Sequence, residues 1–251
     1  MSGTCANTAL PGPAAAPHAV LWEKDGTVRD LGNLGGTVNP QVLAVGNVAL
    51  MINHGGQVAG ASALPEIKST ECPGDPPNPK CFPFHPFLWT REAGMQDLGV
   101  LPGDFVGAGL GLNNQGEVVG PSFAAPGPTS ATPRAFLWAN GKMHDLNALL
   151  PPDSPLYLLI AYAINDSGEI AGLGCVPDTC NTSAPTLHAF LATPCDRTHR
   201  DTDWCKHDGN GRAAEADRTI ARARILSQTA REAPQHVLHP GRSGSQLREP
   251  H

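Results

Sequence analysis

Short apolar runs, each followed by glycine, proline or asparagine, make up most of the first 194 residues. Residues 135–138 form one such run, and the Asn140-Gly141 pair that follows is typical of a two-residue hairpin turn. Residues 143–146 then predict the returning strand, and residues 159–164 and 169–172 predict two more strands around a second turn. This pattern predicts four short antiparallel strands and no long helix.

The same order of phrases occurs in three copies, at residues 18–62, 85–122 and 134–172, and residues 188–194 form a closing strand after them. The copies begin at His18, His85 and Arg134, and the closing strand begins at His188. Three further marks recur: an aspartate-leucine phrase (Asp30, Asp97, Asp145), an asparagine-headed turn (Asn53, Asn113, Asn165) and a closing glycine (Gly60, Gly120, Gly172). A long period built from short strands is typical of arrays of β units.

These copies predict an all-β fold, a β-propeller-like array of four-stranded antiparallel blades with about three complete repeats. Residues 1–17 resemble the end of a preceding repeat. Closed propellers usually need about four blades or more, so we expect self-association, an open fan or an exposed end. Residues 195–251 form an arginine-rich tail with a short predicted helix over about 212–233, and the rest of this tail is predicted to be disordered.

Composition narrows the possible partners. The net charge is −6, and lysine and arginine are scattered through the copies, which gives no basic surface for nucleic acid or anionic lipid. No segment is apolar over the length that spans a bilayer, and the first residues lack the features of a signal peptide. We therefore expect neither nucleic-acid binding nor membrane insertion.

The cysteines indicate an oxidising compartment. Three closely spaced pairs bracket loops, and one cysteine is left over: Cys72 with Cys81, Cys175 with Cys180, Cys195 with Cys205, and Cys5 alone. Metal sites more often show Cys-x-x-Cys spacing, so local disulfides are the simplest expectation. Such disulfides persist outside the cytosol, which favours a secreted protein.

The opening motif, seen most clearly as His188-Ala189-Phe190, and the phrases that follow it in each copy resemble the HAF-repeat family of bacterial, mainly extracellular proteins. The resemblance covers about residues 18–194. It implies a β-propeller-like fold and a secreted location, and the family carries no agreed activity or set of catalytic residues. Arg134 departs from the motif because it stands in place of the histidine.

The repeated histidines have two possible roles. His18, His85 and His188 stand at equivalent strand starts, and in a propeller at equal distances from the axis, so they could converge on a metal or act as catalytic bases. Alternatively, they pair with the recurring aspartates in a structural hydrogen-bond network, because buried polar groups need partners. Arg134 at the same position favours the structural role.

The asparagine-headed turns also allow two interpretations. Asn53, Asn113 and Asn165 could each cap a turn whose fourth residue is glycine. If the turns instead face a central channel, their amide oxygens, with Asp166 nearby, would suit Ca²⁺, which prefers about six to eight oxygen ligands. Ca²⁺-dependent propeller lactonases use an axial site of that kind, where the metal polarises a carbonyl and orients water.

Two functions follow from these patterns. The first is a secreted, Ca²⁺-dependent hydrolase that opens a small lactone or ester with metal-activated water. Its metal ligands would be Asn53, Asn113, Asn165 and Asp166, and its base would be His18, His85 or His188. The second is a noncatalytic extracellular binding or surface module, because repeated concave surfaces commonly serve binding. A chelator and Asn113→Ala should abolish activity in the first case only.

Overall fold

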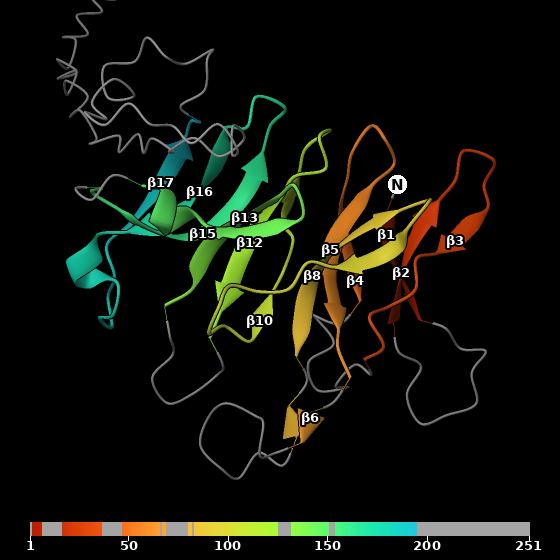
Figure 1. The fold of residues 1–251 in the computed structure, drawn as a ribbon, viewed down its shortest axis with the longest axis horizontal. Coiled ribbons are helices and arrows are strands. Elements are labelled where there is room, and N and C mark those ends of the chain that lie inside the picture. Colours follow the sequence, from red (N-terminus) through yellow and green to blue (C-terminus); the bar gives the residue numbers. More distant parts are fainter. Residues whose placement is uncertain are drawn as a thin grey trace, which may run out of the picture.

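Figure 1 shows the structure of the chain, a computed structural model. It describes residues 18–36, 47–65, 83–124, 132–150 and 154–194 in full, and the backbone of 2–6, 17, 67–68 and 80–81. The predicted tail 195–251, with its helix over about 212–233, lies outside these residues. The predicted pairs that involve Cys72 and Cys195, and the side chain of Cys5, lie outside them too.

The described chain is all-β, and its strands form antiparallel sheets. The first sheet consists of β1 (Ser2–Ala6), β2 (Pro17–Trp22) and β3 (Val28–Asp30). The second consists of β4 (Val48–Ile52), β5 (Val58–Ala63), β8 (Phe84–Thr90) and β9 (Gly94–Asp97). The third consists of β10 (Val106–Gly107), β11 (Gly111–Leu112), β12 (Val118–Phe123), β13 (Arg134–Ala139) and β14 (Lys142–Asp145). The fourth consists of β15 (Tyr157–Ile164), β16 (Ile170–Cys175) and β17 (Leu187–Ala192).

Three smaller features complete the described secondary structure. Strands β6 (Ile67–Lys68) and β7 (Lys80–Cys81) pair with each other apart from the four larger sheets. Two 3₁₀ helices are present, η1 (Leu146–Leu149) and η2 (Pro177–Thr179). No helix in the described part of the chain is long and apolar enough to cross a membrane.

Each internal sheet joins the second half of one sequence copy to the first half of the next. In the second sheet, β4 and β5 come from copy 18–62, whereas β8 and β9 come from copy 85–122. The sequence pattern grouped four strands within one copy, and the structure shifts that grouping by half a copy. The reason is that the closing strand β5 pairs along its length with the next opening strand β8, so the chain passes between sheets after the aspartate-leucine phrase.

The pairing of closing and opening strands keeps one register. The closing glycine lies opposite the aromatic residue of the opening motif in three sheets: Gly60 opposite Phe87, Gly120 opposite Phe136 and Gly172 opposite Phe190. In the first sheet, β1 pairs with β2 so that Gly3 lies opposite Val20. Strand β1 therefore takes the place in the first sheet that β5 takes in the second.

The four sheets lie in a row, from β2 and β3 at the right of Figure 1 to β17 at the left. Apolar residues fill the interfaces between neighbours: Leu21 and Leu31 meet Phe87 and Trp89, Leu88 and Leu98 meet Phe136 and Trp138, and Leu137 and Leu146 meet Leu158 and Phe190. Each sheet has a leading face, which we define as the face toward the preceding sheet. In the second sheet the leading face carries Phe87 and Trp89. The opposite face, which carries Leu88 and Leu98, is the trailing face. Burial of each large apolar side chain contributes about 2 kcal/mol, so these interfaces hold the row together.

The predicted Asn-Gly hairpin is confirmed. Asn140 and Gly141 join β13 to β14 and both have positive φ, 51° and 76°. A type I′ turn requires this conformation at both central residues, and its twist matches that of the flanking strands.

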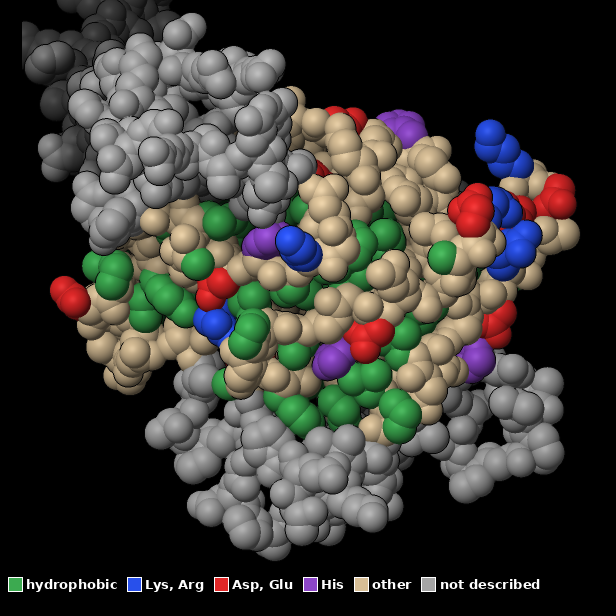
Figure 2. Space-filling view, in the orientation of Figure 1, with side chains coloured by type: hydrophobic (Ala, Val, Ile, Leu, Met, Phe, Trp, Pro, Cys, Tyr) green, Lys and Arg blue, Asp and Glu red, His purple; other side chains and the backbone are tan. Residues whose placement is uncertain are grey.

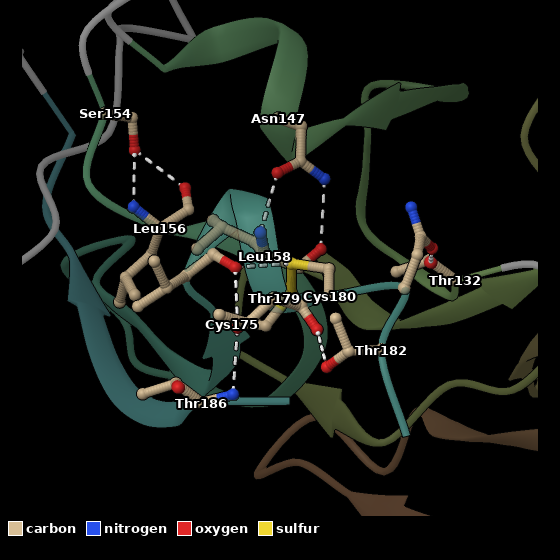
Figure 3. The surroundings of a disulfide bond; sticks show 12 residues. Thr132, Asn147, Ser154, Leu156, Leu158, Cys175, Thr179, Cys180, Thr182 and Thr186 are labelled. Atoms are coloured by element: carbon tan, nitrogen blue, oxygen red, sulfur yellow. Dashed lines mark hydrogen bonds between the residues drawn. A yellow bond between two sulfur atoms is a disulfide. The ribbon is translucent and has the colours of Figure 1, made fainter. Parts of the chain in front are cut away.

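One predicted disulfide is also confirmed, between Cys175 and Cys180, whose Cα atoms lie 5.4 Å apart. Figure 3 shows that it ties the end of β16 to the start of the loop that leads to β17. Close by, the Asn147 side chain accepts the Leu158 N–H at 2.7 Å and donates to the Leu158 carbonyl at 3.0 Å. The last sheet is therefore held both covalently and by a side chain of η1.

Candidate functional site

The asparagine-headed turns, which lead into β5, β12 and β16, share one geometry. In each, the N–H of the fourth residue donates to the asparagine carbonyl: Gly56 to Asn53 at 3.1 Å, Gly116 to Asn113 at 3.2 Å and Gly168 to Asn165 at 3.0 Å. The three glycines have φ of 75°, 80° and 76°. Other residues rarely adopt that conformation, which explains why glycine stands there.

The asparagine side chains are engaged within these turns. The Oδ1 atom of Asn113 accepts the N–H groups of Gln115 at 3.1 Å and Glu117 at 2.9 Å, and its Nδ2 donates to the Glu117 carboxylate at 2.5 Å. Asn165 bonds in the same way to Ser167 and Glu169. An amide oxygen has two lone pairs, so two N–H donors use its ordinary acceptor capacity.

The turns are also bonded to one another. Asn53 donates from Nδ2 to the Asn113 carbonyl at 2.9 Å, and Asn113 donates from Nδ2 to the Asn165 carbonyl at 3.2 Å. Each bond connects one sheet to the next in the row. We call the series Asn53, Asn113 and Asn165 the asparagine ladder.

A second line of polar groups runs beside the ladder, and the sequence pattern singles out only its last member, Asp166. The N–H of His54 donates to Asn114 Oδ1 at 3.0 Å, and Asn114 donates its N–H and its Nδ2 to the Asp166 carboxylate at 2.8 and 2.6 Å. These bonds from Asn114 lower the pKa of the Asp166 carboxyl. The sequence does carry a sign of this second line, because His54, Asn114 and Asp166 each directly follow a ladder asparagine.

The side-chain oxygens that a Ca²⁺ site would use already accept hydrogen bonds, among them the Asn53 Oδ1 atom, which accepts the Gln57 N–H. The Oδ1 atoms of Asn113 and Asn165 each accept two main-chain N–H groups, and both carboxylate oxygens of Asp166 accept from Asn114. A cation would have to displace bonds that hold the turns. The geometry therefore lends no support to Asn53, Asn113, Asn165 and Asp166 as metal ligands, and that role stays a prediction.

Two of the candidate histidines lie beside the aspartates of their own copies. His18 Nδ1 is 2.7 Å from the Asp30 carboxylate, and His85 Nδ1 is 2.9 Å from that of Asp97. Burial alone would raise the pKa of Asp97, but the hydrogen bonds from His85 and from the Gly99 N–H outweigh it, and the pKa is lowered. The aspartate-leucine phrase thus supplies the partner of the opening histidine.

Arg134 takes the place of the histidine in the third sheet and reaches further. It bonds the Asp145 carboxylate at 3.1 Å, as the histidines bond their aspartates, and also Asp104 at 3.0 Å and the Pro102 carbonyl at 2.8 Å. Asp104 precedes β10, so the arginine ties the opening motif to the chain that enters the same sheet.

The third candidate base, His188, lies on β17 opposite Gly174 and is partly buried. His18, His85 and His188 belong to three different sheets. Within the described ranges, no three His, Cys, Asp or Glu side chains come together in an arrangement that could hold a metal ion. The structure does not gather the candidate histidines and carboxylates into one site.

An ion-pair bridge joins the first sheet to the second. Glu23 directly follows β2 and accepts from Arg29 of β3 at 2.9 Å and from Arg91, which follows β8, at 2.5 Å. The hydrogen bonds from Arg91 and then Arg29 lower the pKa of Glu23 from 4.5 to about 2. Figure 2 shows acidic and basic side chains gathered at the end of the row where β3 lies.

Acid should weaken this bridge. Because the folded-state pKa of Glu23 lies below its ordinary value of 4.5, its stabilising contribution is fully present above pH 4.5 and is lost as the pH falls toward 2. We expect the melting temperature of the wild type to fall more steeply over this range than that of Glu23→Gln, as measured by circular dichroism. Asp178→Asn, at an exposed acid in η2, is the control and should follow the wild type. Parallel curves for wild type and Glu23→Gln would contradict the prediction.

Comparison of the chain with family models, with curated proteins and with solved structures found no match. The resemblance to the HAF-repeat family therefore stays a prediction that rests on the motifs of this sequence.

Proposed function

We propose that this protein is a noncatalytic extracellular binding or surface module, built as a β-propeller-like array. The observation that supports this function is how the repeated polar side chains are used. The ladder asparagines bond within their own turns, and Asn53 and Asn113 also bond to the next turn. His18 and His85 bond to aspartates on neighbouring strands. Polar side chains engaged in this way position backbone and sheets, which is a structural task.

The propeller-like arrangement is part of the proposal. Its support is that successive sheets pack face to face, share one strand register and are bonded turn to turn. A repeated unit of this kind buries its faces against its neighbours and leaves its edges and turns for binding. The Cys175–Cys180 disulfide supports the extracellular location, because such bonds persist in oxidising compartments.

The array has apolar surface with which to bind. Leu50, Met51 and Ile52 on the edge strand β4 are exposed, and so is Tyr162 on β15. Leu50 and Tyr162 occupy the same position relative to the ladder, three residues before Asn53 and Asn165. Contiguous apolar side chains on an accessible strand are typical of interaction surfaces.

The Ca²⁺-dependent lactonase or esterase is the competing function and stays a prediction. It would require the ladder to release its oxygens, and His18, His85 or His188 to act as base. A histidine held by an aspartate also occurs where the histidine is catalytic, so the decisive test must measure turnover as well as metal binding.

The experiment measures hydrolysis of a panel of small lactones and aryl esters by the oxidised full chain, with EDTA and with Ca²⁺ restored. The noncatalytic module predicts no turnover and no rise in melting temperature when Ca²⁺ is added. Turnover that EDTA abolishes and Ca²⁺ restores would contradict our proposal and favour the hydrolase.

Asn113→Asp sharpens this test. A carboxylate would strengthen a Ca²⁺ site, so the hydrolase predicts that Ca²⁺ raises the melting temperature of this variant. The structural role predicts a lower melting temperature that Ca²⁺ leaves unchanged, because the new carboxylate would lie against that of Glu117. Asn33→Asp is the matched control, since Asn33 caps a different turn through its bond to the Gly35 N–H at 2.7 Å.

A further inference from the structure

The two end sheets of the row expose side chains at positions that are enclosed at the internal interfaces. Each internal interface joins the trailing face of one sheet to the leading face of the next. We propose that the leading face of the first sheet binds the trailing face of the fourth sheet in a second copy of this chain, so that the protein associates head to tail. This association holds whether or not the module is catalytic.

The leading face of the first sheet carries an exposed tryptophan. Trp22 is 41 % exposed, whereas Trp89, at the same place in the second sheet, is 5 % exposed. The residues paired with the two tryptophans differ in the same way. Val28, opposite Trp22, is 54 % exposed, whereas Met95, opposite Trp89, packs into the interface between the first and second sheets. The first sheet thus presents an interface position with no sheet against it in the described chain.

In the third sheet the corresponding pair is partly buried. Trp138 and its paired residue Met143 both pack against the cluster that includes Leu88 and Leu98 of the second sheet. The tryptophan pairs of the second and third sheets therefore both pack against a preceding sheet, whereas Trp22 and Val28 are exposed.

The trailing face of the fourth sheet, at the other end of the row, also exposes residues whose counterparts are buried. Ala171 and Ala189 are exposed there. Their counterparts in the other sheets are fully buried at 0 %: Ala59 and Val119 for the first position, Ala19 and Ala135 for the second. Small residues that are enclosed in every internal interface are thus accessible on the last sheet.

The internal interfaces supply the pattern for the contact between copies. Trp89 packs into one cluster with Ala19 and Leu21 of the first sheet. The same positions in the fourth sheet are Ala189 and Leu191. Trp22 of a second copy would therefore meet Ala189 and Leu191 as Trp89 meets Ala19 and Leu21.

The two faces differ, so the contact is head to tail rather than symmetric. In Figure 1 the first and fourth sheets lie at opposite ends of the row, so within the described residues these two sheets do not cover each other's end faces. Repeated head-to-tail contact produces a ring when the rotation between copies closes, and a filament when it does not.

The experiment measures the mass of the oxidised full chain by sedimentation and light scattering as its concentration rises. We expect the mass to rise above the 26.2 kDa of one chain. Trp22→Glu, on the leading face, and Ala171→Glu, on the trailing face, should each keep the mass at that of one chain. Gln96→Glu is the control, because Gln96 is exposed on β9 of an internal sheet and lies on neither end face; this variant should associate as the wild type does.

Mixing the two variants tests the direction of the contact. Each variant keeps one intact face, so an equal mixture of Trp22→Glu and Ala171→Glu should form a species of twice the chain mass and nothing larger. A wild type that stays at the mass of one chain up to millimolar concentration would overturn the proposal. Undiminished association of either variant would also overturn it. Near-ultraviolet circular dichroism checks that each variant is folded. If Trp22→Glu does not fold, Val28→Glu replaces it, and if Ala171→Glu does not fold, Ala189→Glu replaces it.

Discussion

Gly120→Ala is expected to lower the free energy of unfolding by about 4 kcal/mol, a cost at the upper end of those of single substitutions. A Cβ atom at this position would lie 1.8 Å from the Ala108 carbonyl oxygen and 3.1 Å from the Phe136 ring. The carbonyl belongs to the backbone of the same sheet and cannot rotate away as a flexible side chain would. The backbone between β10 and β11 would therefore have to move.

The same contact recurs at the closing glycine of the other two copies. A Cβ at Gly60 would lie 1.8 Å from the Val48 carbonyl oxygen, and one at Gly172 would lie 2.1 Å from that of Ile160. In the second and fourth sheets the strand pairing shifts register just beyond this carbonyl, a local irregularity that brings the two backbones close. Glycine is required here because only a residue without a side chain admits this approach.

Urea unfolding of wild type and variant measures the effect. Gly55→Ala is the matched control, because its Cβ would meet only the Asn53 Oδ1 atom at 3.4 Å, an ordinary contact. We expect the control to change the free energy of unfolding by less than about 1 kcal/mol. Equal losses for Gly120→Ala and Gly55→Ala would show that the carbonyl contact does not decide the stability of the sheet.

The sequence predicts best those features that depend on residues close together in the chain. The strands, the Asn140-Gly141 hairpin and the Cys175–Cys180 disulfide each depend on residues close together in the chain, and the structure shows all of them. The aspartate-leucine phrase and the opening histidine lie on paired strands of one hairpin, so their recurrence at a fixed spacing already indicates the bonds of His18 and His85.

The hydrophobic pattern does not determine which distant segments of the chain pair with each other. An apolar run predicts a strand without naming its partner, so the copies do not reveal that β5 pairs with β8 of the following copy. The bond from Asn53 to Asn113 likewise spans 60 residues and depends on how two sheets pack. Arg134 shows the same limit, because its bond to Asp145 follows from the repeat, whereas its bond to Asp104 follows only from the fold.

Asn113→Ala is expected to lower the free energy of unfolding by about 3 kcal/mol, because the side chain is buried and several polar groups lose their partner together. The variant leaves the N–H groups of Gln115 and Glu117 and the carbonyl of Asn165 without this partner, in a site where Asn113 is 3 % exposed. Asn33→Ala is the control, since one main-chain bond to Gly35 is lost there, and we expect a cost of about 1 kcal/mol.

A double-mutant cycle of Asn53→Ala and Asn113→Ala decides whether the ladder acts as a connection between sheets or as separate turn caps. Asn53 donates to the carbonyl of Asn113, and Asn113 holds the turn that presents this carbonyl. If the turns are coupled, the double variant should lose less stability than the sum of the single variants, by about 0.5 kcal/mol or more. Additive losses would mean that each asparagine caps its own turn alone, and the face-to-face apolar packing would then be the main force that keeps the sheets in their row.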